Sequence, residues 1–153
     1  MELFTKAINY SYLTELIGHL SGLAHLRATQ LCTEALADLD LTPKQFVALE
    51  FIANNPTTCQ KEIAAHIGTT PTVMVSVLDA LTARGDVERV RSLEDRRRHS
   101  IALTPQGNST REAVRQAALT VEERLFEESD LSREEWQQLI RLMQKLTNRK
   151  ETP

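Results

Sequence analysis

The sequence predicts a mainly α-helical protein that carries one small β-hairpin. Along most of the chain, apolar residues recur every three or four positions, which is the spacing of amphipathic helices. Only residues 87–103 change to the extended and alternating pattern that is typical of strands. The length of 153 residues and the 41% apolar content suit one domain, which we expect to span residues 1–153.

The first predicted element is one long amphipathic helix, from about Lys6 to Leu39. Its apolar stripe consists of Ile8, Leu13, Leu16, Ile17, Leu20, Leu23, Ala24, Leu31, Ala35 and Leu36. Gly18 and Gly22 lie one turn apart inside this helix, where each glycine costs about 1 kcal/mol of helix propensity relative to alanine. Close approach of another helix would compensate for that cost.

Three short helices are expected next, over residues 43–54, 59–66 and 71–84. A threonine that can cap the helix, followed by a proline at the first helical position, opens the first and the third of them. Gly68 ends the second helix and Gly85 ends the third. Two helices joined by a short turn with glycine form a helix-turn-helix, in which the second helix enters the major groove of DNA. Helix 71–84 is therefore the candidate recognition helix.

A β-hairpin is expected to follow, with strands at 87–91 and 99–103 and a charged tip between them. Residues 84–99 hold six arginines against four acidic residues, whereas the whole chain has a net charge of −3. A charged tip alone is usually a solvated turn. Directly after a helix-turn-helix, however, a positive two-stranded ribbon is typical of a wing that enters a narrow minor groove.

Two further helices complete the prediction. Thr104 and Pro105 repeat the cap-and-proline signal and open a long helix, and a last helix begins at Ser132, where Glu135 completes a capping box. We expect the last helix to bury Trp136, Leu139, Ile140, Met143 and Leu146. The first and last helices are longer and more apolar than the small module between them can cover. We therefore expect each to pair with the same helix of a second copy.

Several classes of protein are disfavoured by composition. The two cysteines are too few for the disulfide framework of a secreted domain, and charged residues interrupt every apolar run near the start of the chain. We therefore expect a cytoplasmic protein without a membrane partner. No Cys or His cluster has the spacing of a metal site, and no nucleophile motif or phosphate-binding glycine loop occurs. The sequence predicts neither an enzyme nor a cofactor.

A winged helix-turn-helix core that binds double-stranded DNA is expected over residues 41–104. The start of helix 71–84 carries short side chains whose hydroxyls can bond base edges or phosphates, and Val73 can touch a thymine methyl. The candidate DNA-binding residues are Thr70, Thr72, Val73, Ser76, Arg84, Arg91, Arg96, Arg97 and Arg98.

The ordered motifs of residues 41–107 resemble the core of the MarR family of transcriptional regulators. These motifs are Leu-Thr-Pro-Lys-Gln-Phe, Gln-Lys-Glu-Ile-Ala-Ala-His-Ile-Gly, Leu-Asp-Ala-Leu-Thr-Ala-Arg-Gly, Glu-Asp-Arg-Arg and Leu-Thr-Pro-Gln-Gly. The resemblance implies a homodimer built from helices in 5–39 and 108–148, which represses genes from a pseudo-palindromic operator. It also implies that Asp95 braces the wing by pairing with an arginine. Ser76 and Ala80 stand where the family often has larger or basic residues. We therefore expect few direct contacts between this helix and the base edges.

The resemblance also implies a signal that releases the DNA, either a small aromatic molecule such as a phenol or an oxidant. The candidate ligand-binding residues are Tyr10, Tyr12, His19, His25 and Arg27, and the alternative is that these are interface or surface residues. Cys32 and Cys59 are the candidate redox residues. A structural role is favoured for both cysteines, because free cysteine is often buried.

A second hypothesis belongs to another class of function. The net acidity and the few polar groups on helix 71–84 also fit a winged-helix module that binds a protein partner and has no specific affinity for DNA. Salt-sensitive, sequence-specific DNA binding would distinguish the regulator from this module.

Overall fold

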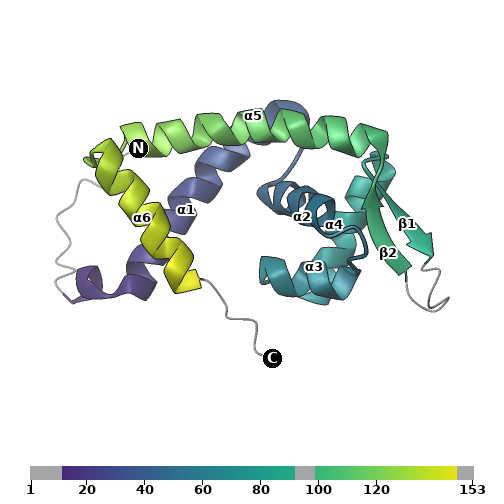
Figure 1. The fold of residues 1–153 in the computed structure, drawn as a ribbon, viewed down its shortest axis with the longest axis horizontal. Coiled ribbons are helices and arrows are strands. Elements are labelled where there is room, and N and C mark those ends of the chain that lie inside the picture. Colours follow the sequence, from purple (N-terminus) through teal and green to yellow (C-terminus); the bar gives the residue numbers. More distant parts are fainter. Residues whose placement is uncertain (1–11, 92–98, 148–153) are drawn as a thin grey trace.

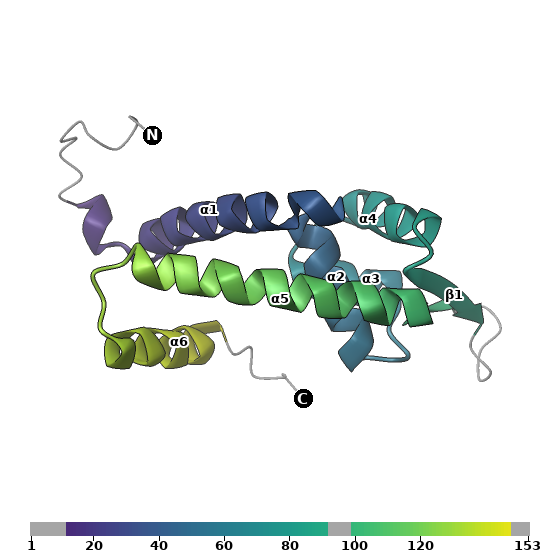
Figure 2. The same cartoon turned by 90° about the horizontal axis from the view of Figure 1, so that it is seen from above.

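The computed structural model describes residues 12–91 and 99–147, and it confirms a mainly helical fold with one antiparallel hairpin (Figure 1). The elements are η1 (Leu13–Glu15), α1 (Ile17–Leu36), η2 (Ala37–Leu39), α2 (Pro43–Asn54), α3 (Gln60–Ile67), α4 (Pro71–Ala83), β1 (Val87–Arg91), β2 (His99–Leu103), α5 (Pro105–Glu127) and α6 (Arg133–Thr147). Helix α5 runs along the molecule, with α2, α3, α4 and the hairpin at one end and α6 at the other (Figure 1). Seen from above, α1 lies beside α5 (Figure 2).

The three Thr-Pro signals begin helices as predicted. The hydroxyl of Thr42 accepts the N–H of Gln45 at 3.3 Å, and the Gln45 side chain returns the contact by accepting the Thr42 N–H at 2.7 Å. The hydroxyls of Thr70 and Thr104 accept the N–H groups of Val73 and Gly107, at 3.3 and 3.0 Å, and cap α4 and α5 without a return contact. Because these caps satisfy N–H groups that lack partners in the first turn, they fix where each helix begins.

One hydrophobic core lies where α2, α3 and α4 meet the hairpin and α5. The members with the lowest exposure are Leu36, Ala48, Leu49, Ile52, Ile63, Met74, Leu78, Leu81 and Val114. The strands contribute Val87 and Ile101, and Ile101 N–H also donates to the carbonyl of Thr58 at 2.9 Å. The hairpin is therefore attached to the helix-turn-helix by both packing and a backbone hydrogen bond.

The prediction of one continuous first helix is wrong. Leu16 has an extended backbone, with φ −93° and ψ 112°, and separates η1 from α1. Within residues 12–91 and 99–147 the apolar stripe is poorly covered there, since Leu16 and Ile17 are 37% and 59% exposed. A helix takes most of its stability from packing of its apolar face, so this uncovered end is where a break costs least.

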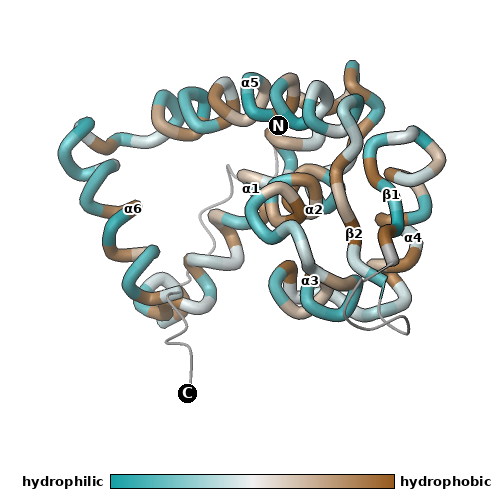
Figure 3. Tube along the Cα trace, turned by 45° about the vertical axis from the view of Figure 1, so that its right-hand side comes forward, coloured by the Kyte–Doolittle hydropathy of each residue, from teal (hydrophilic) through white to brown (hydrophobic). Residues whose placement is uncertain are grey.

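Helix α6 begins with the predicted capping box, in which Ser132 N–H donates to the Glu135 carboxylate at 2.8 Å. The expected burial of its stripe is not found in the single chain, because α6 has no buried residue and Leu146 is 61% exposed. The helix carries hydrophobic and hydrophilic residues and stands apart from the core (Figure 3). Its first turn is joined to α5 by an ion pair, in which Arg133 pairs with Glu123 at 2.8 Å.

Among the residues that the structure describes, no helix is both long and apolar enough to span a bilayer.

Candidate nucleic-acid interface

The exposed start of α4 gathers four of the sequence-predicted DNA-binding residues. Thr70 caps this helix, and Thr72, Val73 and Ser76 follow on its first turns, all of them exposed. The opposite face of α4 is buried in the core through Met74, Val77, Leu78 and Leu81. Helix α3 and the turn at Gly68, whose φ of +70° suits glycine, hold this end of α4 outward.

The hairpin lies directly beyond the end of α4, with Val87 opposite Leu103 and Arg91 opposite His99. Arg89 on β1 donates to the carboxylate of Asp79 on α4 at 3.2 Å, which joins the hairpin to α4. Arg91 is the last residue of β1. The proposed tip residues Asp95, Arg96, Arg97 and Arg98 lie outside the described residues, so their roles stay predictions.

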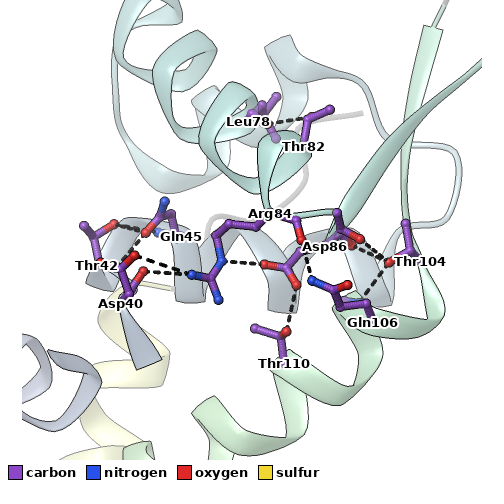
Figure 4. Close-up of polar contacts among 12 residues, drawn as sticks. Asp40, Thr42, Gln45, Leu78, Thr82, Arg84, Asp86, Thr104, Gln106 and Thr110 are labelled. Carbon is purple, nitrogen blue, oxygen red and sulfur yellow. Dashed lines mark hydrogen bonds and ion pairs between the residues drawn. The ribbon is translucent and has the colours of Figure 1, made fainter. Parts of the chain in front are cut away.

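Arg84 takes part in an ion pair inside the fold. Its Nε donates to Oδ2 of Asp86 at 2.8 Å, and its Nη1 donates to the carbonyl of Asp40 at 3.2 Å (Figure 4). Asp86 is fully buried, whereas the Arg84 side chain is 30% exposed. Its bond to Asp86 gives Arg84 a structural task at the end of α4, and its predicted contact with DNA stays a prediction.

The start of α5 forms hydrogen bonds with residues 84–86. Thr110 donates to Oδ1 of Asp86 at 2.7 Å, Thr104 donates to the carbonyl of Gly85 at 2.6 Å, and the Gln106 amide donates to the carbonyl of Arg84 (Figure 4). A Cβ on Gly107 would lie 1.9 Å from the Asp86 carbonyl oxygen, so only glycine permits this approach. We name Arg84, Asp86, Thr104, Gln106 and Thr110 the wing-base network. It joins the ends of α4 and η2 to the starts of β1 and α5.

Sequence reasoning missed the wing-base network because the bonds that link residues 84–86 to α5 join positions 19, 22 and 24 residues apart in the chain. The one local signal was the acidic residue Asp86, placed between Arg84 and the first residue of a predicted strand. A buried carboxylate needs a charged or hydrogen-bonding partner, and Arg84 stood only two residues away.

A second polar link, also missed, joins α2 to α5. Glu50 accepts two hydrogen bonds from Arg111, at 3.0 and 3.1 Å, and two from Arg115, at 2.7 and 3.0 Å. Burial favours the neutral form of Glu50, but the hydrogen bonds and charges of Arg115 and Arg111 outweigh it and lower the pKa of this carboxyl. The sequence signal was the arginine pair at i and i+4, which shares one helix face.

Two of the candidate ligand-binding residues contact side chains outside the candidate set. Arg27 forms a bidentate ion pair with Glu128, at 2.6 and 2.8 Å, which ties α1 to the end of α5. His25 lies 3.5 Å from the hydroxyl of Thr29 on its own helix. His19 is half-buried, Tyr12 is 71% exposed before η1, and Tyr10 lies outside the described residues.

Both cysteines are free and half-buried. Burial raises the pKa of the Cys32 thiol, which packs against the core and thus holds less thiolate than an exposed cysteine. Cys59 begins α3, where its N–H donates to the Glu62 carboxylate at 2.9 Å. Within residues 12–91 and 99–147, no three His, Cys, Asp or Glu side chains are grouped so that they could hold a metal ion.

Comparisons with known proteins agree with this geometry. Residues 39–98 match the family model described as MarR family. The structure of the transcriptional repressor CouR bound to a 23-mer DNA duplex is similar, with a TM-score of 0.80, 32% identity, and coverage of 92% of this chain and 99% of that chain. Wild-type MarR from E. coli gives a TM-score of 0.78 at 25% identity, with coverage of 86% and 97%.

A curated relative adds a sequence match. An HTH-type transcriptional repressor of Mycobacterium tuberculosis is 35% identical over 75 residues, which are 49% of this chain and 54% of the repressor. The matches to curated relatives thus span about half the length of those proteins. Two further structures hold small molecules: CouR bound to p-coumaroyl-CoA, and a Mycobacterium tuberculosis MarR family protein in complex with salicylic acid.

Proposed function

Because this chain belongs to the MarR family, we propose that it is a transcriptional repressor that binds a pseudo-palindromic operator as a homodimer and is released by a small aromatic molecule. One observation carries the proposal: the exposed start of α4 and the hairpin are held in one rigid unit by the core and the wing-base network. A recognition helix and a wing fixed in this way can occupy neighbouring grooves together. The similarity to CouR, whose structure holds a 23-mer DNA duplex, supports binding to double-stranded DNA.

The division of contacts follows from the two surfaces. Thr70, Thr72, Val73 and Ser76 would meet the major groove, because these short side chains let the helix backbone come close to the base edges. The arginines Arg91, Arg96, Arg97 and Arg98 would meet the minor groove, with Asp95 as their brace. Because α4 has no positive side chain, we propose that most of the positive charge that meets the DNA comes from the wing.

A second copy of the chain is the proposed cover for α1 and α6. The exposed apolar residues of these helices are Ile17, Leu20, Leu23, Leu26, Leu139, Ile140, Leu142 and Leu146. So many large apolar side chains exposed on two helices favour an interaction site there. Gly18 and Gly22 also support this, because a Cβ on either would meet no atom of the described residues within 4 Å. Another helix can therefore approach there.

The effector would bind between the helices of the dimer and the winged core. The complexes of relatives with p-coumaroyl-CoA and salicylic acid support an aromatic ligand. Tyr10, Tyr12, His19, His25 and Arg27 are the residues that we propose for it, and the Arg27–Glu128 ion pair is the contact that an anionic ligand would have to replace. Oxidant sensing has less support, because the raised pKa of Cys32 disfavours the reactive thiolate.

Selection of bound sequences from random DNA tests this function. The expected result is a sequence with two related half-sites whose centres are about one helical turn, roughly 34–36 Å, apart. Salicylate and p-coumaroyl-CoA are then added to the complex, and at least one should release the DNA. Recovery of unselected sequences, with equal affinity for all of them, would contradict the proposal and favour the protein-interaction module.

A further inference from the structure

Helix α4 lacks the side chains that usually read guanine and adenine. From Pro71 to Ala83 it contains no Arg, Lys, Asn, Gln or His. Bidentate contacts to guanine come from Arg or Lys, and those to adenine come from Asn or Gln. This helix therefore cannot make either kind of contact, although its exposed start is the surface that the proposed function places in the major groove.

The exposed face of α4 instead presents two valines. Val73 is 38% exposed and Val75 is 39% exposed, and they lie at the two edges of the exposed face, about 160° apart around the helix, with Thr72 and Ser76 between them. They do not belong to the core, which α4 reaches through its opposite face. Thr72 and Ser76 add hydroxyls, but a hydroxyl can donate to or accept from several bases and so discriminates little between them.

Asp79 is the one charged residue of α4, and Arg89 of β1 bonds to it at 3.2 Å. This ion pair offsets a negative charge that would otherwise face the phosphates. The surface left for base contact thus consists of the hydroxyls of Thr72 and Ser76 with a valine at each edge, and it carries no positive side chain.

We propose that α4 reads the C5-methyl groups of thymines through Val73 and Val75, so that its half-site is specified by thymine in the major groove. Apolar contact with the thymine methyl is the one form of direct readout that these side chains provide. The inference rests on the proposed function, because it requires α4 to lie in the major groove. It names the chemical group that the helix recognises there.

Replacement of thymine by uracil tests the inference, because uracil lacks only the methyl group. The operator obtained by selection is synthesised with uracil at one half-site position at a time, and affinity is measured for the full chain. At the positions read by α4, affinity should fall about fourfold for each methyl removed, which corresponds to one buried methyl group. Uracil outside the half-sites should have no effect.

The valine variants assign the effect to its residues. Each of the variants Val73→Ala and Val75→Ala should lose the preference at one position of the half-site. At that position, its affinity for the thymine duplex and for the uracil duplex should be equal. Val47→Ala is the matched control, since Val47 is equally exposed at 38% but lies on α2, and it should keep the preference for thymine. Circular dichroism checks that each variant is folded.

The outcomes separate the two proposals. If wild-type protein prefers the operator over random DNA but binds thymine and uracil duplexes equally, the methyl readout is wrong and the proposed function stands. If the preference for thymine persists in both valine variants, these valines are not the readers. If no operator is preferred over random DNA, both proposals fail.

Discussion

Arg84 Nε donates to Oδ2 of Asp86 at 2.8 Å, and the carboxylate that it neutralises is fully buried. Asp86 receives a second hydrogen bond from Thr110 of α5. The pair therefore joins the end of the recognition helix, the base of the wing and the start of α5. A rotation of α5 relative to α4 would have to break one of these bonds.

Arg84→Ala should lower the free energy of unfolding by about 1–3 kcal/mol, because it leaves a buried carboxylate with fewer partners. Arg84→Lys should lose less, since it keeps the charge but not the directed Nε–H bond. Urea denaturation measures both. An Arg84→Ala variant as stable as wild type would show that Asp86 finds another partner.

Gly107→Ala should disturb both stability and DNA binding. The added Cβ would lie 1.9 Å from the Asp86 carbonyl oxygen, which is backbone and cannot turn aside, so α5 must shift away from the wing base. We expect a lower melting temperature and weaker operator binding. Ser109→Ala, at an exposed position of the same helix turn, is the control and should change neither quantity. Normal operator binding by Gly107→Ala would mean that the wing tolerates this shift.

Glu50 should make stability depend on pH in the acid range. Its folded-state pKa lies below the ordinary value of 4.5, so its ion pairs stabilise the protein above that pH and the benefit is lost as pH falls through the folded pKa. Wild type should therefore exceed Glu50→Gln in stability at neutral pH, and the difference should shrink below about pH 4.5. A constant difference between pH 7 and pH 3 would exclude this linkage.

Leu139→Glu should turn a dimer into a monomer. Leu139 is 43% exposed on α6, on the face that we propose a second copy covers, and a charge buried there without a partner is strongly unfavourable. Gln138→Glu introduces the same carboxylate beside it on the polar face of the helix and should leave the dimer intact. Light scattering after size exclusion gives both masses. A dimeric Leu139→Glu would place the interface elsewhere.

Cys32 should react slowly with iodoacetamide at neutral pH. Burial raises its thiol pKa, and the thiolate is the species that is alkylated. In a Cys59→Ser background, the rate should increase when urea unfolds the protein. If the folded and the unfolded protein are alkylated at the same rate, burial does not protect the Cys32 thiol, and a redox role for it is supported.

The sequence predicted those features that depend on neighbours in the chain. Threonine caps and prolines located the starts of α2, α4 and α5, and the strands fall at 87–91 and 99–103 as expected, because these signals act over a few residues. The break at Leu16 and the exposed stripe of α6 depend on what packs against those helices. The bonds of Thr104 and Thr110 to Gly85 and Asp86 depend on the approach of residues 104–110, which local patterns do not report.

The central claim is that the full chain recognises a specific DNA sequence. Fluorescence anisotropy with the selected operator and a shuffled duplex of the same composition, both at near-physiological salt, measures this directly. The operator should bind at least about a thousandfold more tightly than the shuffled duplex. Equal affinities for the two duplexes would contradict the account.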